Sequence, residues 1–240
     1  MIDNAQQTKA KFARVGENLF SQLKCVAPRE LHSGDWEYAS KYHFERDRSL
    51  SIASRLILYQ TLQEILGEDV WDIQLVQSQG KPVLTGSAIP VDLDVNISHT
   101  PGLVACVVGY GNNVGIDVED TSRSLNIDDI AKRLYHPNEL QQLHWATTDK
   151  QKKQLFFKIW TRKEAFVKAL GVGIVDDLTK HDTLVAQTLP ASPVELPRLG
   201  HDKLAWFKTM ELSPSFILSI CLAGPKHSTP PIFEIKEISL

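Results

Sequence analysis

The order of the predicted helices and strands limits the fold of this chain more than any other feature. Residues 45–66 carry apolar side chains at helical spacing, and Gly67 follows as the expected end of the helix. Three short segments, 92–98, 103–111 and 114–119, then show the residue types and turn signals of β-strands. The first part of the chain therefore predicts one long helix followed by strands.

The same order recurs in the second part. A helical stretch over 127–142 is broken near Pro137, and a second long helix runs from Thr148-Asp149 to Gly171. Further strands are predicted at 182–189, 204–212 and 215–224. Separate runs of helices and strands are typical of α+β proteins. We therefore expect an α+β fold of two halves, residues 1–115 and 116–240.

Composition excludes several classes of function. Apolar residues make up 42% of the 240 residues and charged residues 23%, which are ordinary values for a globular protein. The net charge of −3 and the absence of a basic run argue against a nucleic-acid partner, so any anion needs a local site. Cys25, Cys106 and Cys221 lie far apart, which fits neither a disulfide framework nor a zinc site.

The sequence shows no sign of export or of a membrane segment. Residues 1–16 lack the apolar core of a secretory signal peptide. No run approaches the roughly 18 apolar residues of a membrane-spanning helix. We therefore expect a cytoplasmic protein without a membrane partner.

Two carboxylates stand out on the strand predicted over 114–119. Alternate side chains of a strand share a face, so Asp117 and Glu119 point together while Ile116 and Val118 point into the core. Carboxylates directed at one place repel unless a cation lies between them, and Mg²⁺ suits hard oxygen ligands while leaving places for phosphate oxygens. A half-buried strand with a solvated acidic face is the alternative.

The second long helix places its charges unusually. Its core-facing stripe includes Ile159, Phe166 and Leu170. At about 100° per residue, Lys163 falls close to that stripe, whereas Glu164 and Lys168 stand together on the other side. An ordinary solvated Glu–Lys pair, with a lysine that extends its ammonium group into water, is the alternative.

Several residues of the first half could bind an anion. Ser98 and His99 lie at the end of a predicted strand, and Lys81 lies in a loop between a glycine and a proline. Arg48 and Arg55, seven residues apart, share one face of the first long helix, and arginine matches phosphate geometry. A structural histidine and a solvated helix face are the alternatives, and neither usual glycine-rich phosphate loop is present.

Four of these motifs together carry a resemblance to a known family. In order, they are "GKP" at 80–82, "NISH" at 96–99, "GIDVE" at 115–119 and "WTRKEAFVK" at 160–168. Their order and spacing resemble the signature of 4′-phosphopantetheinyl transferases, in the larger surfactin-synthetase-type class. The match reaches from about residue 40 to about residue 175.

The resemblance implies both a fold and an activity. Such enzymes are pseudodimers of two similar α+β halves with the active site in the cleft between them. They transfer 4′-phosphopantetheine from coenzyme A to a serine hydroxyl of an apo acyl or peptidyl carrier protein, depend on Mg²⁺ and release 3′,5′-ADP. The resemblance also implies that the chain acts as a monomer.

It implies catalytic residues as well. Asp117, Glu119 and Glu164 would be the Mg²⁺ carboxylates. Glu139, in "YHPNEL", aligns with the family glutamate proposed as general base. The lysines that would contact the pyrophosphate and the substrate are Lys163 and Lys168.

The coenzyme A residues follow the family pattern with one departure. Lys81 would lie along the adenosine portion, and Ser98 and His99 would meet the 3′-phosphate side. Arg55 matches the arginine of the early helix, but the family's preceding arginine falls at Leu50 here. Arg48, which would contact the 3′-phosphate, is displaced from that place by two residues.

Two other functions compete with this interpretation. A metal-dependent nuclease can also use Asp-x-Glu and a lysine, but it would need the basic track that this chain lacks. A catalytically inactive protein that only binds carrier proteins would have lost a carboxylate or a lysine, and all of them are present.

Overall fold

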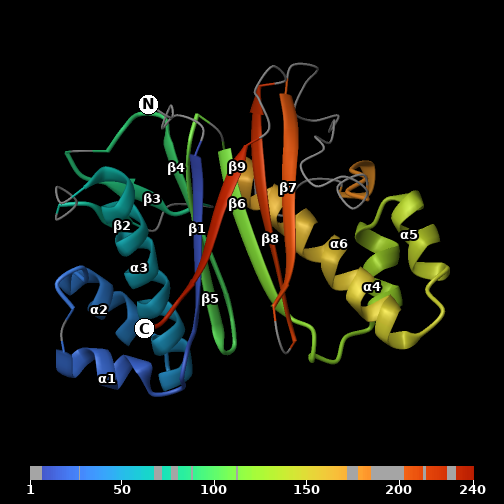
Figure 1. Cartoon of the computed structure of the whole chain (residues 1–240). Helices are drawn as coiled ribbons and strands as arrows, with labels where there is room; N and C mark the ends of the chain where they lie inside the picture. Colours follow the sequence, from blue (N-terminus) through green and yellow to red (C-terminus); the bar gives the residue numbers. More distant parts are fainter. Residues whose placement is uncertain are drawn as a thin grey trace. The chain divides into compact units, whose positions relative to one another are not determined.

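The structure is a computed structural model of the chain. It describes residues 7–26, 28–67, 72–76, 81–87, 89–111, 113–171, 178–184, 203–212, 215–225 and 231–240. The chain separates into two compact units, one of Met1–Gly111 with Phe233–Leu240 and the other of Asn112–Ile232. Figure 1 labels the helices and strands of both units. Each unit combines helices with antiparallel strand pairs, so the mixed helix-and-sheet fold expected from the sequence is confirmed.

The first unit is built on a four-stranded sheet in the order β4-β5-β1-β9. The strands are β4 Leu93–Thr100, β5 Leu103–Tyr110, β1 Gln7–Arg14 and β9 Ile232–Ile238. β4 and β5 form an antiparallel hairpin. Its turn contains Gly102 with φ of 88°, a backbone conformation that glycine adopts without steric cost. This hairpin carries the predicted anion-binding residues Ser98 and His99.

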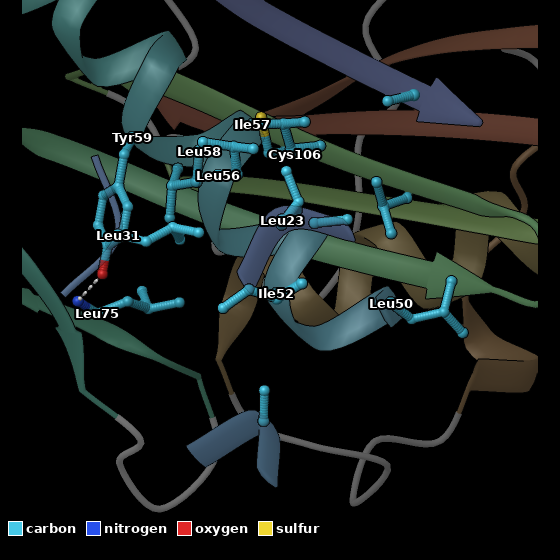
Figure 2. Packing of buried hydrophobic residues seen from close by; sticks show 14 of the residues in the cluster. Leu23, Leu31, Leu50, Ile52, Leu56, Ile57, Leu58, Tyr59, Leu75 and Cys106 are labelled. Carbon is cyan, nitrogen blue, oxygen red and sulfur yellow. Dashed lines mark hydrogen bonds between the residues drawn. The ribbon is translucent and has the colours of Figure 1, made fainter. Parts of the chain in front are cut away.

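Helix α3, Glu45–Leu66, packs on this sheet and forms most of the first core. Helices α1, Leu19–Val26, and α2, Ser33–Ser40, also pack on α3. Because these neighbours cover different sides of α3, nearly every side chain between residues 49 and 62 is buried. The cluster shown in Figure 2 includes Ile52, Leu56, Ile57, Leu58 and Cys106.

A small hairpin joins the same core through one tyrosine. Its strands are β2, Gln74–Val76, and β3, Val83–Thr85. The Tyr59 hydroxyl oxygen accepts a hydrogen bond from the Leu75 backbone N–H at 3.0 Å, which Figure 2 also shows. The contact fixes β2 against α3.

The second unit is built on a three-stranded sheet in the order β6-β8-β7. The strands are β6 Asn113–Asp120, β8 Phe216–Pro225 and β7 Lys203–Leu212. Helix α6, Asp149–Leu170, packs on this sheet, with the short helices α4, Ile127–Leu134, and α5, Pro137–His144, beside it. As predicted, Thr148 caps α6 at its start and Gly171 ends it with φ of 67°.

The structure departs from the expected halves in two places. β9 lies beside β1, so residues 233–240 belong to the first unit, whereas we expected the second half to run to residue 240. The predicted strand at 182–189 is not a strand over 182–184, and its remainder lies outside the described residues. Among the described residues, no helix has the length and apolar character needed to cross a membrane.

Candidate functional site

A glycine sets the distance between β6 and α6. A Cβ atom added to Gly115 would lie 1.9 Å from the backbone oxygen of Ala165 and 2.5 Å from the backbone nitrogen of Ala169. Any side chain at this position would therefore collide with the backbone of α6. Because side chains alternate along a strand, Asp117 and Glu119 point to the same side as Gly115, toward α6. The close approach thus directs both carboxylates at the helix.

Three side chains of α6 meet these carboxylates. The Lys168 ammonium donates to Asp117 Oδ1 at 2.7 Å, and the Trp160 indole N–H donates to Glu119 Oε1 at 3.1 Å. Glu164 lies one turn from each of them on the same face of the helix. The predicted convergence of Asp117, Glu119, Glu164 and Lys168 is therefore present, and Trp160 joins it.

Arg123 completes this cluster from outside the helix. It follows β6 along the chain, and its guanidinium donates to Glu119 Oε2 at 2.5 Å. Its side chain is 47% exposed. The sequence analysis missed both Arg123 and Trp160, although an arginine four residues after Glu119 and a tryptophan one turn before Glu164 were visible signals.

The carboxylates of the cluster disfavour one another's charge. The pKa of Glu164 is raised, first by burial and then by the charge of Asp117, with Lys168 acting in the opposite direction. The pKa of Glu119 is raised by burial and by Asp117, while Arg123 and Trp160 oppose the shift. Such perturbed carboxyl groups are typical of sites that bind a cation or move a proton.

The described residues do not form a finished metal site. Among them, no group of three or more histidine, cysteine, aspartate or glutamate side chains is arranged to hold one ion. Lys168 and Arg123 contact oxygens of Asp117 and Glu119 instead. The oxygen donors suit Mg²⁺ in kind. Their side chains would have to turn to coordinate it together.

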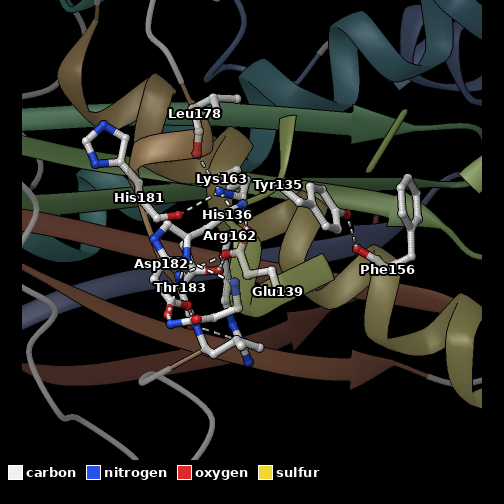
Figure 3. A network of polar contacts seen from close by, with 12 residues as sticks. Tyr135, His136, Glu139, Phe156, Arg162, Lys163, Leu178, His181, Asp182 and Thr183 are labelled. Atoms are coloured by element: carbon white, nitrogen blue, oxygen red, sulfur yellow. Dashed lines mark hydrogen bonds and ion pairs between the residues drawn. The ribbon is translucent and has the colours of Figure 1, made fainter. Parts of the chain in front are cut away.

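Lys163 lies in a buried network of polar contacts. Its side chain is 1% exposed, and its ammonium forms an ion pair with Glu139 at 2.9 Å. The same ammonium donates to the backbone oxygens of Leu178 and His181, each at 2.7 Å (Figure 3). In this structure Lys163 therefore contacts Glu139 and the backbone near residue 180. Its contact with a pyrophosphate group stays a prediction.

Glu139 lies in the same buried network. Its side chain is fully buried, and Oε2 also accepts from the His136 backbone N–H at 2.8 Å, which caps the start of α5. Oε1 accepts from both the backbone N–H and the hydroxyl of Thr183, each at 2.8 Å. A general base must reach the proton that it removes. Both oxygens of Glu139 have partners in this structure, and its role as a base stays a prediction.

In the first unit, Arg55 is also engaged in a buried ion pair. Its guanidinium pairs with Asp35 at 2.9 Å and lies 4.2 Å from the centre of the Tyr38 ring. Asp35 caps α2 through the His32 backbone N–H. Arg55 therefore fixes α2 to α3, and its contact with a phosphate group stays a prediction.

The remaining predicted anion-binding residues are spread over the first unit. Arg48 donates to the backbone oxygen of Tyr42 at 2.8 Å. Lys81 forms an ion pair with Asp94 of β4. Ser98 is buried and His99 is exposed, as expected for consecutive residues of a strand that point to opposite faces.

Comparison with known proteins gives matches in both parts of the chain. A family model described as the 4′-phosphopantetheinyl transferase superfamily matches residues 113–221. A second model, described as 4′-phosphopantetheinyl transferase, N-terminal, matches residues 17–109. The first match contains β6 and α6, and the second contains α3 and β4.

Individual relatives show the same likeness. The chain is 31% identical to the 4′-phosphopantetheinyl transferase HetI of Nostoc sp. over 207 residues, which covers 85% of this chain and 83% of HetI. It is 27% identical to the 4′-phosphopantetheinyl transferase Sfp of Bacillus subtilis over 190 residues, covering 79% and 80% of the two chains. An L-aminoadipate-semialdehyde dehydrogenase-phosphopantetheinyl transferase of Xenopus laevis is 27% identical over 161 residues, covering 63% of this chain and 51% of its own.

Proposed function

Because the chain belongs to the 4′-phosphopantetheinyl transferase family, in the Sfp-like class, we propose that it transfers 4′-phosphopantetheine from coenzyme A to a serine hydroxyl of an apo acyl or peptidyl carrier protein. The reaction requires Mg²⁺ and releases 3′,5′-ADP. One observation on this chain's own residues carries the proposal. The close approach of β6 and α6 at Gly115 brings Asp117 and Glu119 beside Glu164 and Lys168.

In the proposed reaction, the serine hydroxyl loses its proton to water, and its oxygen attacks the phosphorus that bears pantetheine. The anhydride bond to the second phosphorus breaks, and the leaving 3′,5′-ADP takes the bonding electrons. Negative charge grows on the leaving group, so neutralising that charge accounts for most of the catalysis. Lys168 suits this task because its side chain is 30% exposed and its ammonium can exchange Asp117 for a phosphate oxygen.

Asp117, Glu119 and Glu164 are the proposed holders of Mg²⁺. Burial and, after it, the charge of Asp117 raise the pKa of Glu119 and Glu164, and a cation among the three carboxylates would offset both effects. When bound, Mg²⁺ would neutralise phosphate charge. Arg123 would then leave Glu119, while the indole of Trp160 keeps the other carboxylate oxygen in place.

On the coenzyme A side, we retain Lys81, Ser98, His99 and Arg48 as proposed contacts. His99 provides the sharpest test. A charge-assisted hydrogen bond to the 3′-phosphate contributes about 1.5–3 kcal/mol, so His99→Ala should weaken coenzyme A binding about ten- to a hundredfold. The same variant should hardly change the affinity for dephospho-coenzyme A, which lacks that phosphate. An equal loss with both ligands would remove His99 from the site.

The reaction itself is tested by mass spectrometry. Purified protein is incubated with coenzyme A, Mg²⁺ and several apo carrier proteins, and each carrier is expected to gain the mass of one phosphopantetheine group at its serine. Asp117→Asn should abolish the gain, whereas the matched control Glu237→Gln changes an exposed carboxylate of β9 and should not. No gain on any carrier would contradict the proposal. Cleavage of plasmid DNA with Mg²⁺ would instead favour the nuclease.

We further propose that the protein acts as a monomer. The family matches cover both parts of one chain, residues 17–109 and 113–221, which supports activity of a single copy. Light scattering of the active fraction measures its mass, and a dimer mass would contradict this proposal. The pseudodimeric arrangement implied by the resemblance stays a prediction.

A further inference from the structure

The buried ion pair of Glu139 and Lys163 joins three segments of the second unit. Glu139 belongs to α5, Lys163 to α6, and the backbone oxygens that accept from Lys163 belong to residues 178–181. An ammonium group has three N–H donors, and the described part of the chain already offers Lys163 three acceptors. A buried charge pair is tolerated when its polar atoms are satisfied in this way.

A neighbouring arginine ties the same region to the sheet. Arg162 donates through Nε to the Thr209 hydroxyl of β7 at 2.8 Å and through Nη1 to the Thr183 backbone oxygen at 3.3 Å. Thr183 in turn donates twice to Glu139. Two consecutive residues of α6 are therefore held by one network of contacts (Figure 3).

This anchor determines which residues α6 turns toward β6. Consecutive helical residues point about 100° apart. With Lys163 held in the buried pair, Glu164 points along a different side, together with Trp160 and Lys168 one turn away in each direction. Trp160 and Lys168 contact Glu119 and Asp117 of β6. Gly115 sets the distance between the elements, and the buried pair sets the rotation of the helix.

We propose that Glu139 and Lys163 are positioning residues: their buried ion pair fixes the rotation of α6 so that Glu164 and Lys168 face Asp117 and Glu119. Neither residue contacts substrate. The inference rests on the proposed transferase function, because it assigns these two residues a role in that reaction. A misplacement of about 1 Å can cost on the order of a hundredfold in rate, so the pair matters for catalysis without taking part in it.

The test compares two single variants with the double variant. Glu139→Gln and Lys163→Met each leave one buried charge without its partner, whereas the double variant leaves neither charge. We expect each single variant to lower kcat on the order of a hundredfold, with the KM for coenzyme A nearly unchanged. The double variant should recover most of the lost Tm, because no buried charge is left without its partner, but little of the lost kcat, because no ion pair remains to fix the rotation of α6. A folded double variant with wild-type kcat would overturn the proposal.

A milder variant covers the case in which the charge variants do not fold. Thr183→Val removes one hydrogen bond to Glu139 and changes no charge. It should lower kcat severalfold and leave the KM for coenzyme A unchanged. The matched control Thr147→Val changes an exposed hydroxyl and should leave both kcat and KM unchanged. An unchanged kcat in Thr183→Val would overturn the proposal.

The two proposals fail in different ways. A wild-type protein that modifies no carrier protein overturns the transferase function. Wild-type transfer together with a double variant of wild-type kcat overturns only the positioning role. Loss of the acidic limb of the pH–rate profile in Glu139→Gln would instead identify Glu139 as a general base and would also overturn the positioning role.

Discussion

Helices α3 and α6 are both 22 residues long, and each packs on the sheet of its own unit. Neighbours cover α3 on nearly every side, and its buried stretch runs almost without interruption from residue 49 to residue 62. α6 is buried along one side and keeps Trp160, Glu164 and Lys168 partly exposed on another. Two helices of equal length thus have different roles. α3 mainly contributes buried side chains to the core, whereas α6 also presents polar groups on a partly exposed side.

Their ion pairs differ in the same way. Arg55 of α3 and its partner Asp35 have side chains that are 5% and 6% exposed. Lys168 of α6 is 30% exposed, although its partner Asp117 is 7% exposed. A buried pair holds its partner permanently, whereas a half-exposed lysine can exchange one anion for another. Exposure therefore distinguishes Arg55, which suits a structural role, from Lys168, which suits a ligand contact.

The largest expected effect comes from removing the cation of each pair. Arg55→Met leaves Asp35 charged and buried, which costs about 3–5 kcal/mol and lowers Tm on the order of 10 °C. Lys168→Met should lower Tm less, because its lysine is partly hydrated. Thermal unfolding with and without Mg²⁺ measures the Tm of both variants. Mg²⁺ should restore the Tm of Lys168→Met alone, because it replaces the lost positive charge.

Kinetics sharpens this comparison. At a temperature where both variants are folded, Arg55→Met should keep the wild-type KM for coenzyme A, and Lys168→Met should lose turnover even with Mg²⁺. A KM raised tenfold or more in Arg55→Met would show that Arg55 contacts the ligand. That result would remove the distinction between the two cations.

The next effect concerns the carboxylate of α6. Glu164→Gln should lower turnover by about a hundredfold or more, because it removes one proposed oxygen ligand from the cluster. Excess Mg²⁺ should restore part of the rate. The matched control on α3 is Glu64→Gln, which changes a carboxylate paired with Lys11 and should leave turnover unchanged. Near wild-type turnover of Glu164→Gln at low Mg²⁺ would show that the ligand assignment is wrong.

A smaller effect tests the approach of α6 to its sheet. Gly115→Ala places a methyl group against the backbone of α6, so the helix must shift, at a cost of about 1–3 kcal/mol. Tm and turnover should both fall. Gly34→Ala is the matched control in α2, because an added Cβ there meets nothing within 4 Å. Equal Tm values for the two variants would contradict the close packing.

Local sequence pattern predicted much of this site. The alternation of β6 placed Asp117 and Glu119 on one face, and helical spacing placed Glu164 and Lys168 together on another. Glycine also marked the ends of α3 and α6, at Gly67 and Gly171. Each of these predictions depends on residues within a few positions of one another, where backbone geometry fixes side-chain direction.

Partners distant in sequence could not be predicted in this way. Lys163 lay close to the apolar stripe as expected, but its partner Glu139 is bound in turn by Thr183, 44 residues further along the chain. Arg55 likewise pairs with Asp35 of another helix. β9 joins β1 from the other end of the chain. Tertiary contacts decide such pairings, so the sequence identified charged residues correctly but not which of them are buried.

The smallest expected effect follows from the raised pKa of Glu164. A carboxyl group whose pKa is raised by folding stabilises the folded state below its unfolded pKa, and this contribution is lost as pH rises through the folded pKa. At neutral pH, the charge of Glu164 beside Asp117 therefore destabilises the Mg²⁺-free protein. Glu164→Gln removes this charge and should raise Tm on the order of 1–2 °C at pH 7, a small gain because the side chain is partly hydrated.

The pH dependence of that gain is the decisive measurement. Below the ordinary glutamate pKa of about 4.3, Glu164 is protonated in both states, so the Tm difference between wild type and Glu164→Gln should vanish. Mg²⁺ at pH 7 should reverse the order by stabilising the wild type alone. Glu211→Gln, which breaks an exposed pair with Lys158, should give no gain at either pH. A gain of equal size at pH 4 and pH 7 would show that the polar face of α6 carries no charge penalty, and α6 would then differ from α3 only in its burial.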